Sequence, residues 1–213
     1  MIRQTINPES FSARELAQAV QILREDGVVA YPTETVYGLG ASMLSAHAVD
    51  RIFEIKGRES GKPISLMIAG LDMLNSLCYE ITDQAAHLIE AFWPGPLTLV
   101  FLASEQLPDY LRNESGTVGI RFPKHELSTE LVRLLGAPIT STSANRSGQP
   151  AASDAVQVAA QLGGRVDCLI DGGICSGKIP STVVDVTGAA PKLLRQGAIA
   201  FSEIELRVKG IRI

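Results

Sequence analysis

The chain has 213 residues, of which 46% are hydrophobic, and this length is enough to bury the core of one α/β domain. Its formal net charge of −4 argues against a protein that holds RNA through overall charge alone. No apolar run is long enough to span a bilayer and no secretory pattern opens the chain, so we expect a cytoplasmic protein without a membrane segment. Three cysteines without a CxxC spacing, Cys78, Cys168 and Cys175, predict buried free thiols rather than disulfides or a zinc site.

Five segments have the apolar spacing of amphipathic helices. The first begins with a capping box, formed by Ser12 and Glu15, and ends at Gly27. The second begins at Ser45 and ends near Gly57. The remaining three are expected at residues 83–92, 126–135 and 154–162. These helices alternate with apolar runs along the chain, which is typical of an α/β fold.

Short apolar runs between these helices predict strands. They lie at residues 28–33, 64–69, 97–102, 118–122, 138–142, 168–171, 182–186 and 192–195. We therefore expect one α/β domain over residues 1–213, with a core at about 12–197 and a twisted, partly parallel sheet. Residues 198–213 alternate weakly and are expected to form an extra strand or a loose C-terminal extension.

The familiar phosphate-binding and metalloprotease motifs are absent from the sequence. The chain has no GxGxxG after a strand, no GxxxxGK[ST] and no HExxH. The histidines, His47, His87 and His125, lie apart without metal-ligand spacing, and we expect them to be surface or loop residues. The sequence therefore predicts no protein metal site, and any nucleotide site must be unconventional.

Two hydroxyl-rich segments follow apolar strands, where open α/β sheets bind ligands. The segment YPTETVYGLG, residues 31–40, could be only a strand and a glycine turn. Its four hydrogen-bonding side chains, however, favour a wall that binds a small zwitterion. The second segment, TSTSAN at residues 140–145, has no histidine beside it, so we expect no hydrolase nucleophile there.

Cations are concentrated on one loop between a helix and a strand, which carries Lys56, Arg58 and Lys62. The helix dipole accounts for Lys56 at the helix end. Arg58 and Lys62 lie beyond the glycine, where they suit a triphosphate, and the loop is a candidate lid over the phosphates. Arg121, in the strand segment VGIRFP, is expected either to face solvent or to be a buried anchor for a carboxylate.

The segments YPTETVYGLG, KGR with KP, WPGPLT, VGIRFP, TSTSAN, STVVD and RQG occur in an order and spacing that strongly resemble the YrdC-like family of threonylcarbamoyl-AMP synthases. The resemblance runs from about the first helix to Gly197. It implies a YrdC-like domain, in which a twisted mixed sheet with flanking helices carries a concave, positively lined pocket. It also implies an enzyme that makes threonylcarbamoyl-AMP and pyrophosphate from L-threonine, bicarbonate or CO2, and ATP, for a tRNA modification next to the anticodon.

The resemblance implies roles for residues of this chain by their positions in the motifs. The expected catalytic set fills the family's Lys-x-Arg and Ser-x-Asn signature and comprises Lys56, Arg58, Ser143 and Asn145. The positions that match threonine contacts are Thr35, Arg121, Ser141 and Ser181. The positions that match ATP contacts are Arg58, Lys62, Thr117, Ser143, Ala151 and Arg195. Two local differences are Met67, where some relatives have a polar residue near threonine, and Ala151, at an expected backbone contact to the nucleotide.

The implied chemistry places few demands on side chains as acids or bases. Catalysis would depend on positioning and on positive charge from the lysines, Arg58 and Mg2+ brought with ATP. The implied partners are downstream tRNA threonylcarbamoyl transferase proteins, with possible contact to tRNA or double-stranded RNA. Two other functions stay open: a carbamoyl-adenylate-forming module, as in hydrogenase maturation proteins, and a non-catalytic relative that binds double-stranded RNA or the ribosome.

Overall fold

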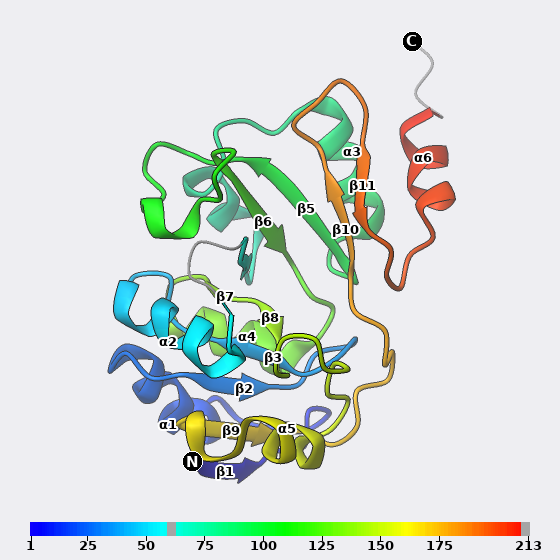
Figure 1. Ribbon diagram of the computed structural model, residues 1–213. Helices are drawn as coiled ribbons and strands as arrows, with labels where there is room; N and C mark the ends of the chain where they lie inside the picture. The colour runs from blue at the N-terminus through cyan, green and yellow to red at the C-terminus, as the bar shows by residue number, and fades with distance from the viewer. Residues whose placement is uncertain (59–62, 210–213) are drawn as a thin grey trace.

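The computed structural model describes residues 1–58 and 63–209, and Figure 1 shows how its elements are arranged. The helices are α1 (Ala13–Arg24), α2 (Ala46–Lys56), α3 (Asp83–Phe92), α4 (Glu126–Leu135), α5 (Ala155–Leu162) and α6 (Phe201–Lys209). The strands are β1 (Ile2–Thr5), β2 (Val29–Tyr31), β3 (Gly38–Gly40), β4 (Ser65–Met67), β5 (Leu97–Leu102), β6 (Thr117–Arg121), β7 (Ile139–Thr140), β8 (Thr142–Ser143), β9 (Cys168–Asp171), β10 (Thr182–Asp185) and β11 (Lys192–Arg195). Short 3-10 helices lie at Leu71–Ser76, Asp109–Leu111 and Gly163–Arg165. The five predicted helices are confirmed, with small shifts at their ends.

The strands form two mixed sheets rather than the single sheet expected from the sequence. Among the described residues, the first sheet has the strand order β1-β9-β2-β3-β8 and the second has the order β11-β10-β5-β6-β4-β7. In the first sheet β2 runs parallel to β9 and antiparallel to β3, and in the second β5 runs parallel to β10 and antiparallel to β6. The expected α/β class with mixed, partly parallel pairing is therefore confirmed. In Figure 1 the first sheet lies below the second, and α3 and α6 lie beside the second sheet.

The chain passes from one sheet to the other at Ser141. Strand β7 pairs with β4 in the second sheet, whereas β8 pairs with β3 in the first. Between them, the backbone N–H of Ser141 donates to the carbonyl oxygen of Ser65 at 2.6 Å. The prediction of one strand over residues 138–142 is therefore wrong, because the segment is divided between two strands of two residues each, β7 in the second sheet and β8 in the first. The crossing places the hydroxyl-rich segment between the two sheets.

The expected glycine turn at residues 38–40 is instead a strand. Strand β3 pairs antiparallel with β2, so that Gly38 lies opposite Tyr31. The Tyr31 ring covers Gly38 so closely that an added Cβ would lie 2.6 Å from a ring carbon. The hydroxyl group of Tyr31 donates to the carbonyl oxygen of Thr140 at 3.1 Å, and this bond fastens the hairpin to the second sheet.

Two hydrophobic clusters hold the layers together. The larger contains residues of α2, α3 and the second sheet, and the smaller joins α1 and α4 to the first sheet. In the smaller cluster Leu16, Leu23 and Leu131 are fully buried, and burying a leucine side chain contributes about 2 kcal/mol. The three cysteines are buried free thiols, as predicted.

Both ends of the described chain pack into the fold. Helix α6 lies next to α3, and Ile204 on its inner face is fully buried. For residues 201–209, the expectation of a strand or a loose extension is wrong, because Phe201, Ile204 and Val208 recur at helical spacing and pack against the larger cluster. At the other end, β1 pairs in parallel with β9, although the sequence pattern did not indicate a strand there. No helix in the described part of the chain is long and apolar enough to cross a membrane.

Candidate active site

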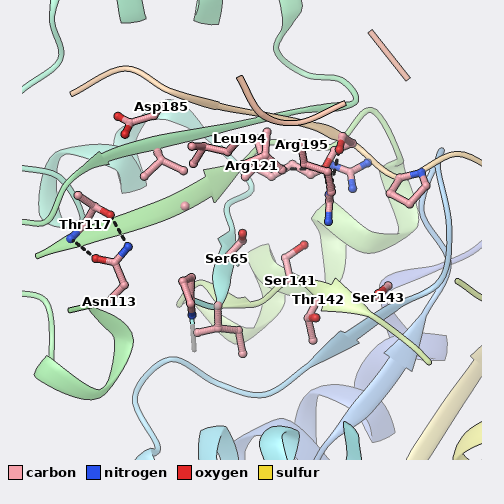
Figure 2. A pocket seen from close by; sticks show the side chains of 18 of the residues that line it. Ser65, Asn113, Thr117, Arg121, Ser141, Thr142, Ser143, Asp185, Leu194 and Arg195 are labelled. Carbon is pink, nitrogen blue, oxygen red and sulfur yellow. Dashed lines mark hydrogen bonds between the residues drawn. The ribbon is translucent and has the colours of Figure 1, made fainter. Parts of the chain in front are cut away.

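A cavity of about 570 Å³ lies between the two sheets, and Figure 2 shows it from close by. This volume is in the range of cavities that bind small molecules and cofactors. Strands β10, β5 and β6 of the second sheet form its floor, and β3, β8 and the crossing at Ser141 contribute to the opposite wall. The cavity is therefore lined by side chains from both sheets.

The floor follows the two-residue period of a β-sheet. Alternate residues of a strand point to the same face, and residues paired across neighbouring strands share that face. Arg121 on β6 pairs with Thr98 on β5, which pairs with Val183 on β10, and all three line the cavity. The next floor residues along the strands are Gly119, Val100 and Asp185, followed by Thr117 and Leu102.

Arg121 is a buried arginine that lines the cavity. Its Nη2 lies 2.9 Å from Oε1 of Glu34, in an ion pair, and donates to Oγ1 of Thr35 at 2.9 Å. Its Nε is buried and has no hydrogen-bond partner among the residues that the structure describes. The structure thus shows the buried anchor and not the solvent-facing arginine. An unpaired buried donor costs about 1–3 kcal/mol, so this N–H group is suited to a ligand that accepts from it.

Arg195 lies beside Arg121 (Figure 2), and Ser181 lines the same cavity. The Nη2 of Arg195 donates to the carbonyl oxygen of Ser181 at 2.9 Å and to its Oγ at 3.2 Å. The Ser181 hydroxyl group is also hydrogen-bonded to that of Thr98 at 2.8 Å. Partial burial lowers the pKa of Arg195, and the charge of Arg121 lowers it further. The two cations therefore disfavour each other in a space where an anion would stabilise both.

Arg58 reaches the cavity from the loop after α2. Its guanidinium group lies 5.9 Å from the centroid of the Phe53 ring, and its Nη2 donates to the carbonyl oxygen of Pro63 at 2.7 Å. A guanidinium group has five N–H donors, so this bond leaves several for a ligand. Burial lowers the pKa of Arg58, which remains a cation at neutral pH. Its position is consistent with the expected phosphate contact.

Lys56 lies behind the cavity rather than in its wall. The residue is 5% exposed, and its Nζ donates to the carbonyl oxygens of Ser143 and Asn145 at 2.5 and 3.0 Å. Asn145 is also buried, and its amide nitrogen donates to two carbonyl groups of the same turn. Neither Lys56 nor Asn145 is among the described residues that line the cavity. The signature residues are thus brought together, with Arg58 and Ser143 facing the cavity while Lys56 and Asn145 hold the loop.

The pKa of Lys56 predicts a pH dependence of stability. Burial and, to a lesser extent, the charge of Arg58 lower this pKa to about 8. Because the unfolded chain keeps the ordinary higher value, it binds more protons than the folded chain between about pH 8 and pH 10. The contribution of Lys56 to the free energy of unfolding should therefore rise with pH through this window, by about 3 kcal/mol in full. The thiols of Cys168 and Cys175 oppose this rise, because burial raises their pKa values in the folded chain.

Urea unfolding at pH values between about 7.5 and 9.5 checks this prediction. We expect the free energy of unfolding of the Lys56→Met variant to have a lower pH slope than that of the wild type, and that of the Lys192→Met variant, at an exposed lysine, to have the wild-type slope. The measurements stop below the pH at which tyrosines of the unfolded chain ionise. Burial raises the pKa values of Tyr31 and Tyr37, so at higher pH their ionisation would favour the unfolded chain and obscure the effect of Lys56. Equal pH slopes in all three proteins would contradict the assignment to Lys56.

The other expected site residues have different positions. Those that line the cavity are Thr117, Ser141, Ser143 and Ser181. Thr35 is not among the described lining residues and contacts the cavity through Arg121. Ala151 is also outside that set, and Lys62 lies outside the described residues. Met67 is fully buried in the smaller hydrophobic cluster.

Some residues of the site were not singled out from the sequence. They are Ser65, Asn113, Asp185 and Leu194, which line the cavity, and Glu34, which forms the ion pair with Arg121. The position of Asp185 could have been found, because the alternation of STVVD places it on the same face as Ser181. Ser65 gives no such signal, since only the pairing of β4 with β6 brings it opposite Gly119.

The described residues offer no protein site for a metal ion. They contain no group of three or more His, Cys, Asp or Glu side chains that could hold one. Asp185 is the one acid among the described residues that line the cavity. Mg2+ takes six oxygen ligands, so this donor set does not fit Mg2+ unless substrate phosphates supply the others.

The fold and the cavity together define a class of α/β protein with a site for small anions between two mixed sheets. Arginine side chains and hydroxyl groups line this site. Within this class the chain belongs to the Sua5/YciO/YrdC family, because residues 21–197 match the family model Sua5_yciO_yrdC, described as "Telomere recombination". The YrdC-like resemblance inferred from the motifs is therefore confirmed.

Named relatives and solved structures agree with this family. The threonylcarbamoyl-AMP synthase of Pyrococcus abyssi is 45% identical over 195 residues, which cover 92% of this chain and 57% of the relative. The synthase of Bacillus subtilis is 42% identical over 203 residues, which cover 93% of this chain and 58% of the relative. The crystal structure of P. abyssi Sua5 complexed with L-threonine has a TM-score of 0.94 and 42% identity, and the match covers all of this chain and 62% of that one. This chain thus spans less than two thirds of the length of these relatives.

Proposed function

We propose that the protein makes threonylcarbamoyl-AMP and pyrophosphate from L-threonine, CO2 or bicarbonate, and ATP, the activity for which its relatives are named. The observation that carries the proposal is the unpaired, buried Nε of Arg121 in a cavity that also contains Arg58 and Arg195. The cavity offers separate cations for a carboxylate and for a phosphate chain. In this proposal the protein acts in the cytoplasm, and its product passes to the transferase proteins that modify tRNA.

Threonine would bind at the Arg121 end of the cavity. A guanidinium group matches the geometry of a carboxylate, and the Glu34 and Thr35 contacts hold Arg121 in one orientation. The hydroxyl groups of Ser141 and Ser181 would hydrogen-bond the remaining polar atoms of the amino acid. The similarity of this chain to P. abyssi Sua5, whose crystal structure is a complex with L-threonine, supports this choice of substrate.

ATP would occupy the rest of the cavity. Arg58 and the Ser143 hydroxyl group would contact the β- and γ-phosphates, and Arg195 would lie near the α-phosphate. Thr117 would contact the nucleoside at the far end. Phosphate contact by Lys62 and nucleotide contact by Ala151 stay predictions from the sequence.

The proposed reaction forms two bonds. The threonine nitrogen adds to the carbon of CO2 and loses a proton, which gives an N-carboxy group. An oxygen of this group then attacks the α-phosphorus of ATP, and the bond from that phosphorus to the bridging oxygen breaks, so that pyrophosphate leaves. Since two anions must approach each other, the contribution of the protein is positioning and cationic stabilisation by Arg121, Arg195 and Arg58. Mg2+ bound to the phosphates would stabilise the negative charge that develops on the leaving pyrophosphate.

The proposal is tested by incubating the purified protein with ATP, Mg2+, labelled bicarbonate and threonine, serine or valine. We expect a labelled adenylate and pyrophosphate with threonine. A folded protein that makes no adenylate but binds RNA tightly and in a salt-sensitive manner would replace the proposal with the RNA-binding function.

The same experiment makes a prediction about substrate choice. A site that hydrogen-bonds the threonine hydroxyl group leaves buried polar groups unpaired when valine binds. We therefore expect kcat/KM for threonine to exceed that for valine by about 100-fold or more. Equal kcat/KM values for threonine and valine would show that the hydroxyl groups around Arg121 do not recognise the threonine hydroxyl group.

A further inference from the structure

Asp185 is an acidic side chain in a cavity whose other charged lining residues, within the described chain, are arginines. Its Oδ1 accepts hydrogen bonds from the backbone N–H of Thr187 at 2.8 Å and from the Thr187 hydroxyl group at 2.7 Å. These two bonds hold the carboxylate in one orientation, while the described residues form no hydrogen bond to Oδ2. The side chain therefore presents a fixed, free acceptor.

The strand register gives the position of Asp185 relative to the cations. Arg195 and Arg121 belong to the row that contains Val183. Asp185 lies two residues beyond Val183, which is about 7 Å along the strand. Thr117 lies four residues from Arg121, which is about 13 Å. In Figure 2 Asp185 and Thr117 lie on the same side of the cavity, away from the two arginines.

The floor in the row of Asp185 has no bulky side chain. In the row of Asp185 the floor residues are Val100 and Gly119, and Gly119 has no side chain. A Cβ added to Gly119 would lie 2.7 Å from Oγ of Ser65, so the close packing there depends on glycine. The exposed side chain of Leu194 also lines the cavity. The space thus has an apolar floor and a carboxylate at its edge.

We propose that Asp185 accepts a hydrogen bond from a ribose hydroxyl group and thereby selects ribonucleotides over deoxyribonucleotides. This inference rests on the proposed function, in which ATP fills the cavity. In a nucleotide the ribose lies between the α-phosphate and the base, as the Asp185 row lies between the arginine row and Thr117. An ionised carboxylate only accepts hydrogen bonds, so it matches a hydroxyl donor and disfavours a phosphate.

The test compares ATP with 2′-deoxyATP and 3′-deoxyATP in the wild-type protein and in Asp185→Ala. A hydrogen bond to a charged acceptor predicts that the wild type prefers ATP over at least one deoxynucleotide by about 10- to 100-fold in kcat/KM. In Asp185→Ala we expect this ratio to fall to within about threefold. Because both nucleotides are measured on the same preparation, a loss of folded protein does not change the ratio.

Two further variants complete the comparison. Asp185→Asn keeps the size and the Oδ1 acceptor for Thr187 but has an NH2 donor in place of the free Oδ2 acceptor. It provides a folded protein without the charge or that acceptor, and we expect an intermediate ratio because a ribose hydroxyl oxygen can still accept from the amide. Asp50→Ala, at an exposed acid on α2, should keep the wild-type ratio. Equal use of all three nucleotides by the wild type, or an unchanged ratio in Asp185→Ala, would overturn the inference.

Calorimetric titration of the same nucleotides separates this inference from the proposed function. If the wild type makes no adenylate but still binds ATP more tightly than a deoxynucleotide, and Asp185→Ala removes that difference, the proposed reaction fails and the role of Asp185 stands. If adenylate forms and the binding ratios do not depend on Asp185, the reaction stands and the role of Asp185 fails.

Discussion

Replacement of Arg58 with alanine is expected to lower the rate of adenylate formation by about 30- to 1000-fold, because a charged contact to phosphate in such a site is worth roughly 2–4 kcal/mol. Arg58 lines the cavity, and the one hydrogen bond that its side chain makes within the described chain is to the Pro63 carbonyl group. The variant therefore loses few internal contacts and should remain folded. Steady-state rates of pyrophosphate release measure the effect.

Two variants serve as controls for Arg58→Ala. Arg58→Lys keeps the positive charge but loses the planar fork, so we expect an intermediate rate. Arg165→Ala removes an exposed arginine outside the cavity and should leave the rate unchanged. Near-wild-type turnover in Arg58→Ala would remove this residue from the mechanism.

The parts of the fold that the sequence predicted are those with local signals. The capping box of Ser12 and Glu15 begins α1, where the Glu15 carboxylate accepts from the Ser12 backbone N–H at 2.8 Å. The division into two sheets has no local signal, because it depends on which distant strands pair. Ser141 illustrates this limit: its neighbours on both sides are in strands, yet the strands belong to different sheets.

The candidate site shows the same limit. The motifs indicated Arg58, Arg121 and Ser143, and the structure brings all three to one cavity. The sequence could not show that Lys56 donates to backbone carbonyl groups instead of lining this space, because its partners lie on a loop 87 and 89 residues away. Glu34 was also missed as the partner of Arg121, since the ion pair joins the connection between β2 and β3 to the end of β6 in the other sheet.

Replacement of Arg121 with glutamine is expected to affect both stability and threonine use. The side chains of Arg121 and Glu34 are only 7% and 16% exposed, so removing the cation leaves a largely buried carboxylate without its partner. Breaking one side of such a pair costs about 3 kcal/mol, and we expect the free energy of unfolding to fall by that amount. With the proposed carboxylate anchor removed, kcat/KM for threonine should fall by about 100-fold or more, since a lost charge-assisted bond is worth up to about 3 kcal/mol.

The double variant Arg121→Gln with Glu34→Gln separates the two effects. It removes the uncompensated carboxylate, so urea unfolding should show much of the lost stability restored. Threonine use should not recover, because the proposed anchor of the substrate carboxylate, the Arg121 guanidinium group, is still absent. If activity returned together with stability, Arg121 would be a structural residue and the threonine site would lie elsewhere. If stability returned without activity, the guanidinium group that leaves its Nε unpaired in the cavity would be the one that binds threonine.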